Sequence, residues 1–225
     1  MRKRTTRISG TNIIHVLPVE ITKHHQFTGN KLKMSRTALL CIDYINDIVH
    51  TDGKVSGKGY ADFVGRHSTL EAVAKLQDAA RSTNHLVIHV KVGFSPSYIE
   101  QNKNSPLTGK AHEFGALNLG EWGTEFHEKV LPKDGEPIIA KNRVNPFHAT
   151  NLDLLLRAAG VDHLVMSGVS TDMAVEACAR DAHDRDYRVT VISDCCAATS
   201  DDEHNNSLKT MTKFGTVVTS AEMKW

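Results

Sequence analysis

The sequence lacks any long apolar segment. A membrane-spanning helix needs roughly 20 consecutive apolar residues, and no uninterrupted run in the chain approaches that length. The segment 13–21 is apolar in part, but His15, Pro18 and Glu20 interrupt it, and no small-residue cleavage site follows. These absences argue against a membrane span and a secretory signal, so we predict a cytoplasmic protein with no membrane partner.

Cysteine and net charge are also low. None of the four cysteines belongs to a CxxC pair; Cys41, Cys195 and Cys196 fall in or beside apolar runs, and Cys178 lies among small residues. We expect buried free thiols in a reducing compartment. A formal net charge of +1 gives no reason to expect a nucleic-acid partner. The basic run at positions 2–7 leaves a localisation or nucleic-acid patch open, but a frayed terminus accounts for it more simply.

Motifs for metals and phosphates are missing as well. The 13 histidines are scattered, and no HExxH motif occurs among them. The segment 51–59, TDGKVSGKG, does not fit the phosphate loop GxxxxGK[ST], because Gly53 and Gly57 stand one residue too close together. We therefore predict no metal site and no cofactor.

Apolar runs that are typical of buried strands alternate with helical patterns over residues 36–225. In the segment 68–82, for example, Leu70, Val73 and Leu76 recur at helical spacing. This alternation predicts the α/β class, a three-layer doubly wound parallel sheet with helices on both faces. Residues 1–35 are predicted to form an N-terminal extension or arm, and 36–225 a single domain. Strands are expected at 37–44, 86–92, 137–140, 163–167, 188–192 and 216–219, and helices at 68–82, at 150–160, from 171 onward and at 200–215.

The stretch 160–186 is the centre of this organisation. Residues 163–167 predict a strand buried on both faces, and Gly168, Val169 and Ser170 then break it. Thr171 or Asp172 can cap a helix that opens directly afterwards. A strand that passes into a helix N-terminus presents free backbone N–H groups to an anion or a developing oxyanion. We place the active site there.

Two charged residues also fall at predicted strand ends. Asp43 stands at the C-terminal end of the strand 37–44, and Lys141 follows the strand 137–140. Ligands of parallel sheets bind at the carboxyl ends of the strands, so the two side chains are expected to meet there. An Asp and a Lys in a partly dry cleft can hold a proton between them and serve as a general acid or base. An ordinary buried ion pair remains the alternative.

The segment 93–122 predicts a long polar connection that carries aromatic residues. Connections of this length in a compact domain commonly serve as a lid or shape a substrate pocket, and a surface excursion with minor packing is the alternative. Lys91, Lys110 and Arg143 could recognise a carboxylate, or each could be a solvated surface charge. Substrate identity does not follow from this segment.

Three segments together resemble the isochorismatase-like hydrolase superfamily, which includes nicotinamidases, N-carbamoylsarcosine amidohydrolases and isochorismatases. The segment 42–48, IDYINDI, is similar to the family's V-D-x-Q-N-D-F. The segment 141–152 is similar to K-x-x-x-S-A-F-x-x-T-x-L, and 168–175, GVSTDMAV, to G-V-x-T-N-x-C-V. The resemblance covers roughly residues 36–220 and implies a hydrolase that acts on a small molecule.

The resemblance also implies roles for single residues. Asp43 would be the general acid or base, and Lys141 its charge partner. The turn at Val169 and Ser170, often a cis peptide in this family, would present N–H groups of Ser170 and of position 174 as an oxyanion hole, and Phe147 would line the pocket. The family's metal-binding insert is absent. A homodimer or homotetramer is expected by the same analogy, with the arm and the 93–122 segment as contacts.

Ala174 departs from the family pattern, because the cysteine-hydrolase branch carries its nucleophile there. Without a thiol no acyl-enzyme can form, and Cys178 lies one helical turn away. Ile45 also replaces the glutamine of the first motif. Four interpretations stay open: an isochorismatase-like enzyme in which Asp43 protonates a vinyl ether, an amide or ureide hydrolase whose cysteine has been replaced by alanine, a natural cysteine-less hydrolase that uses activated water, and a non-catalytic binding or scaffold protein.

Overall fold

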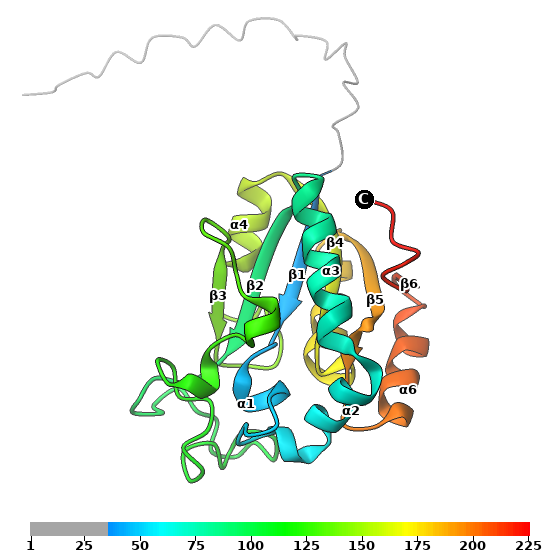
Figure 1. Ribbon diagram of the computed structural model, residues 1–225. Coiled ribbons are helices and arrows are strands. Elements are labelled where there is room, and N and C mark those ends of the chain that lie inside the picture. The colour runs from blue at the N-terminus through cyan, green and yellow to red at the C-terminus, as the bar shows by residue number, and fades with distance from the viewer. Residues whose placement is uncertain (1–35) are drawn as a thin grey trace, which may run out of the picture. The chain divides into compact units, whose positions relative to one another are not determined.

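The computed structural model describes residues 36–225, which form a central sheet covered by helices on both faces (Figure 1). This is the predicted α/β class with a three-layer arrangement. The arm predicted for residues 1–35 lies outside the described residues. None of the helices between residues 36 and 225 is long and apolar enough to cross a membrane.

The sheet has six strands, all parallel, in the order β3-β2-β1-β4-β5-β6. The chain adds β2 and β3 on one side of β1 and then returns to add the other strands on the opposite side. The order therefore reverses between β1 and β4, and ligands of such sheets bind at this switch point. The strands are β1 (Arg36–Ile42), β2 (Leu86–Val92), β3 (Ile138–Lys141), β4 (Val161–Val169), β5 (Arg188–Ala197) and β6 (Thr216–Val218).

Two apolar clusters, one on each face of the sheet, form the core. Helix α3 packs on one face because Leu70, Val73 and Leu76 recur on one side of it, as predicted. On the other face, Cys178 and Ala182 of α5 lie in a second cluster with α4 and α6. The helices are α1 (Asn46–Val49), α2 (Tyr60–His67), α3 (Thr69–Ser82), α4 (Leu152–Ala158), α5 (Glu176–Asp184) and α6 (Asp201–Met211), with 3₁₀ turns η1 (Ser56–Lys58), η2 (Trp122–Thr124) and η3 (Glu128–Val130).

The structure differs from the sequence-based boundaries at several places. Helices α1 and α2 were not expected. The helix expected from residue 171 begins instead as a π-helical turn, η4 (Thr171–Val175), before α5 starts at Glu176. Strand β5 continues through Cys195 and Cys196 to Ala197, beyond the predicted end at residue 192, and its pairing with β4 shifts register between Met166 and Gly168. The extra length keeps these two thiols inside the core, where both are buried and free.

A buried charge cluster ties α3 and β2 to the segment before β3. The Arg81 guanidinium contacts both oxygens of the Glu136 carboxylate at 2.8 and 2.9 Å, and His89 Nε2 lies 2.9 Å from Glu136 Oε2. Burial alone would raise the pKa of Glu136, but hydrogen bonds from Arg81, the Lys133 N–H and His89 outweigh it and hold that pKa at about 2. Burial also lowers the pKa of His89. Both shifts favour the folded state at neutral pH over acidic pH.

We predict that Glu136→Gln reduces the pH dependence of unfolding. The folded-state pKa of Glu136 is depressed from 4.5 to about 2, so its contribution is present above pH 4.5 and is lost as pH falls toward 2. That loss amounts to about 3 kcal/mol in the original protein. Urea unfolding at a series of pH values should show a flatter acid limb for Glu136→Gln. The exposed-carboxylate control Glu113→Gln should retain the original slope; equal slopes in all three proteins would contradict the assignment.

Candidate active site

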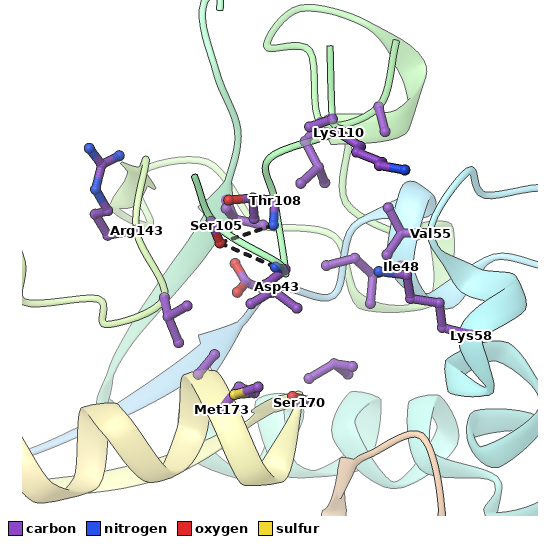
Figure 2. A pocket seen from close by; sticks show the side chains of 18 of the residues that line it. Asp43, Ile48, Val55, Lys58, Ser105, Thr108, Lys110, Arg143, Ser170 and Met173 are labelled. Atoms are coloured by element: carbon purple, nitrogen blue, oxygen red, sulfur yellow. Dashed lines mark hydrogen bonds between the residues drawn. The ribbon is translucent and has the colours of Figure 1, made fainter. Parts of the chain in front are cut away.

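A cavity of about 530 Å³ lies over the carboxyl ends of the central strands. Asp43 follows β1, Val92 ends β2, Lys141 ends β3 and Val169 ends β4, and all four line it. Such a placement follows from the parallel topology, because every strand of the sheet ends at the same edge. The opposite wall comes from the segment 93–122 and from η1, as Figure 2 shows for Ser105, Thr108, Lys110 and Lys58.

Asp43 and Lys141 meet at the floor of this cavity. Lys141 Nζ lies 2.7 Å from Asp43 Oδ2, and the two side chains are 1% and 3% exposed, respectively. Lys141 Nζ also donates to the carbonyl oxygen of Arg143 at 3.2 Å. The Asp43 backbone has φ 59°, a left-handed conformation that non-glycine residues adopt rarely, and its N–H donates to Val90 O at 2.8 Å. The two side chains are therefore in contact, as expected from their positions at strand ends.

The second oxygen of Asp43 takes no part in the contact with Lys141. Burial raises the pKa of Asp43, and the Lys141 ammonium only partly offsets that rise. Asp43 Oδ1 is buried and has no hydrogen-bond partner of good geometry within residues 36–225, although the backbone N–H of Val92 also acts to lower the pKa of this carboxyl group. A carboxyl group in this position can deliver or accept a proton through Oδ1 while Oδ2 stays on the ammonium.

The turn after β4 forms the adjoining part of the floor. The peptide bond between Val169 and Ser170 is cis, and both residues line the cavity. Ala174 also lines it and is 4% exposed, so its methyl group occupies the wall beside Asp43 and Lys141. The structure therefore brings together five of the predicted site residues. The oxyanion role of the Ser170 and Ala174 N–H groups stays a prediction.

Phe147, which we expected to line the pocket, is not among the residues of the cavity wall. It is buried in the core cluster on the α5 side of the sheet. Its ring is stacked on Tyr187 with centroids 6.1 Å apart, and the Arg185 guanidinium lies 4.9 Å from the ring centroid. The spacing from Lys141 could not reveal this, because the direction of the side chain depends on the turns between the two residues.

No cysteine lines the cavity among the described residues. Cys178 is completely buried in the core, and burial raises its pKa far above the ordinary thiol range. A buried protonated thiol outside the cavity cannot replace a nucleophile at position 174. Within residues 36–225 there is likewise no cluster of three or more histidine, cysteine or acidic side chains arranged to hold a metal ion.

Asp47 holds the cavity wall in place, a role that sequence reasoning missed. Its carboxylate is buried and accepts hydrogen bonds from the backbone N–H groups of Leu117, at 2.6 Å, and of Lys54, at 3.2 Å. Gly123 approaches the same carboxylate so closely that a Cβ there would lie 2.4 Å from it. Asp47 thus joins α1 to both parts of the wall, the 93–122 segment through Leu117 and the turn before η1 through Lys54. The sequence feature that could have indicated this role is the second acidic residue of the segment 42–48.

Helix α6 fixes the turn that carries Ala174. Thr171 Oγ1 lies 2.8 Å from His204 Nδ1, and Ser207 Oγ lies 3.1 Å from Thr171 O and 2.6 Å from Glu176 Oε2. Burial lowers the pKa of His204, which favours the neutral ring that can exchange a hydrogen bond with a hydroxyl. Sequence reasoning predicted a helix at 200–215 but not these contacts, which give α6 a physical role at the site.

We predict strong energetic coupling between Asp43 and Lys141. Removing one partner leaves the other charge buried, so Asp43→Leu or Lys141→Met alone should cost about 3–5 kcal/mol of unfolding free energy. The double variant leaves no buried charge and should cost less than the sum of the two by about 2 kcal/mol. Denaturant unfolding measures all four proteins. The exposed pair Glu71 and Lys129 serves as the control, with coupling within error of zero; equal coupling in both cycles would contradict this reading.

Comparisons with known proteins show the family of the chain. The model of the isochorismatase domain matches residues 37–223. Ureidoacrylate amidohydrolase RutB of Variovorax paradoxus is 29% identical over 177 residues, which cover 72% of this chain and 69% of that protein. Maleamate amidohydrolase of Pseudomonas putida is 29% identical over 193 residues, covering 85% and 87%.

A solved structure also shares the fold of this chain. A cysteine hydrolase from Pseudomonas syringae superposes with a TM-score of 0.74 at 27% identity, covering 83% of this chain and 90% of that one. The matched family model spans nearly all of the described residues, including the strand ends that carry Asp43 and Lys141. Because of this match, the chain belongs to the isochorismatase family and is a hydrolase.

Proposed function

We propose that the chain hydrolyses a small carboxylate- or amide-bearing metabolite with the Asp43 and Lys141 pair and without a cysteine nucleophile. The observation that carries this proposal is the contact of 2.7 Å between Lys141 Nζ and Asp43 Oδ2 beneath a cavity, with Asp43 Oδ1 unpartnered in the described part of the chain. The pair needs no third residue to act as acid and base in turn.

In the proposed reaction, water adds across the scissile bond. Asp43, whose pKa burial raises, delivers its proton to the leaving group as the bond to carbon breaks. Water supplies hydroxide to that carbon, and the remaining proton returns to Asp43, so the enzyme ends unchanged. An amide fits this scheme directly, because its nitrogen leaves with the added proton. With a vinyl ether, Asp43 instead protonates the terminal alkene carbon. Water then adds to the oxocarbenium carbon and returns a proton to Asp43, and the hemiketal breaks down to a ketone and an alcohol. Lys141 keeps the carboxyl group in place and stabilises its ionised form between the two proton transfers.

The backbone N–H groups of Ser170 and Ala174 complete the scheme as an oxyanion hole. The position of the two residues supports this role. Both line the same cavity as Asp43, and they lie at a turn that α6 holds through Thr171. Donors fixed before the reaction stabilise a developing negative charge without reorganisation.

Two relatives support the substrate class. They are named for ureidoacrylate and maleamate, which are short amides with a carboxylate. A cavity of about 530 Å³ is of a size that holds small metabolites.

We predict that Asp43→Asn lowers hydrolysis by at least about 10³-fold, because asparagine keeps the shape of the site but cannot transfer the proton. A panel of short amides, ureides and a vinyl ether such as isochorismate, run on the purified protein, measures this. The exposed control Asp62→Asn should keep the original rate. No turnover of any panel member by the original protein, or full activity in Asp43→Asn, would contradict the proposal.

A second candidate is an amide or ureide hydrolase whose catalytic cysteine is replaced by Ala174. The observation in its favour is the position of Ala174, which lies on the cavity wall with Asp43, Lys141 and Ser170 around an otherwise complete site. In this case the site binds amides but cannot form the acyl-enzyme intermediate. A non-catalytic binding protein with the same pocket is the third alternative.

Ala174→Cys separates these candidates. If the pocket belongs to a cysteine hydrolase, the new thiol should raise turnover of ureides or short amides by at least about 10²-fold, since a nucleophile beside a base opens the covalent route. Ala177→Cys, on the following helical turn, is the matched control and should leave turnover unchanged. Unaltered turnover in Ala174→Cys would favour the acid and base mechanism, and inactivity of both proteins would favour a binding role.

We also propose a homo-oligomer, a dimer or a tetramer, in a reducing compartment such as the cytoplasm. Exposed apolar side chains of the 93–122 segment support a subunit contact: Ile99 is 82% exposed, Phe114 64% and Trp122 47%. The four free buried cysteines support the compartment, because disulfides would be expected to form more often outside the cell.

A further inference from the structure

The cavity wall is strongly basic although the whole chain is nearly neutral. The formal net charge of the chain is +1, whereas the wall carries five cationic side chains and one carboxylate, that of Asp43. General basicity of the protein therefore does not explain the concentration of positive charge. The five cations are Lys54, Lys58, Lys110, Lys141 and Arg143.

Three of these cations already have partners within the protein. Lys141 contacts Asp43. Lys54 Nζ donates to Gly115 O at 2.6 Å, and Arg143 Nη1 donates to the carbonyl oxygens of Glu100 and Asn142 at 2.8 and 2.7 Å. Lys54 and Arg143 therefore help to fasten the 93–122 segment, although their charges still add to the potential of the cavity.

Lys58 and Lys110 are different. Neither forms an ion pair or hydrogen bond with any residue between 36 and 225. They come from separate parts of the chain: Lys58 ends η1, and Lys110 lies in the 93–122 segment. Figure 2 shows the Lys58 side chain extending toward Ile48, with its nitrogen beside that residue, and Lys110 above Val55; both lysines line the cavity. Two ammonium groups beside apolar side chains attract an anion more strongly than they would in open water.

We infer that the substrate is an organic anion and that Lys58, with Lys110, binds its carboxylate while the scissile bond lies at Asp43 and Ala174. This inference rests on the proposed function for the position of the scissile bond, but the carboxylate site itself does not depend on catalysis. It excludes neutral amides such as nicotinamide as preferred substrates. Lys58 contributes to substrate specificity in this scheme and takes no part in proton transfer.

Binding of inert probes tests the carboxylate site separately from hydrolysis. Benzoate and acetophenone, butyrate and 2-pentanone, and glutarate and 2,6-heptanedione are pairs of similar shape that differ in charge and contain no hydrolysable bond. Calorimetric titration should show at least one carboxylate binding roughly tenfold or more tightly than its ketone, because a charge-assisted hydrogen bond is lost in the ketone. Added salt should weaken the carboxylate more than the ketone.

Variants then assign the site. Lys58→Met should weaken the carboxylate roughly tenfold and leave the ketone unchanged, and Lys58→Met with Lys110→Met should remove the preference. Lys75→Met, an exposed lysine of α3 away from the cavity, is the control and should change neither. The inference is overturned if no carboxylate binds better than its ketone, or if Lys58→Met weakens both probes equally or neither. Charge-selective binding without turnover of any substrate would instead overturn the proposed hydrolysis alone.

Discussion

The contact between Asp43 and Lys141 is the constraint on which the site depends. Both side chains are almost completely buried, and removing either charge from water is costly unless the partner is within contact distance. β1, β2 and β3 must therefore end in register, because the two side chains meet over the end of the intervening strand β2. The same burial raises the pKa of Asp43 and so makes the carboxyl group suitable for proton transfer. The close contact of the two buried side chains is therefore needed both for stability and for the proposed proton transfer.

The cavity has a floor made by the sheet and a wall made by segments outside the sheet. The floor consists of strand ends and the turn at Ser170, which are held by the sheet and by α6 through Thr171. The wall comes largely from the 93–122 segment, which has little regular structure and is fastened at buried Asp47. Relatives that share the fold can therefore keep the acid and base pair while the wall selects another substrate.

In the proposed function, Ala174 makes the chemistry of the cavity floor depend on proton transfer by Asp43. In a site with a thiol at this position, the acidic partner would serve mainly to activate the nucleophile. Position 174 carries a methyl group in this chain, and Cys178 is buried away from the cavity. The nucleophile in the proposed scheme is therefore water. In the proposed scheme, the positive wall holds an anionic substrate in position above Asp43.

The sequence by itself determined the parallel α/β architecture and the meeting of Asp43 with Lys141, because buried strands are written as local apolar runs and parallel strands all end at one edge. It also marked the turn at Ser170 through the break after the strand 163–167, and Ala174 through the resemblance of the segment 168–175 to a family motif. Only the tertiary structure decided that Phe147 lies in the core, that Asp47 fastens the wall, and that Lys58 lines the cavity. Those outcomes depend on the directions that side chains take after irregular turns, where no repeating pattern relates position in the chain to position in space.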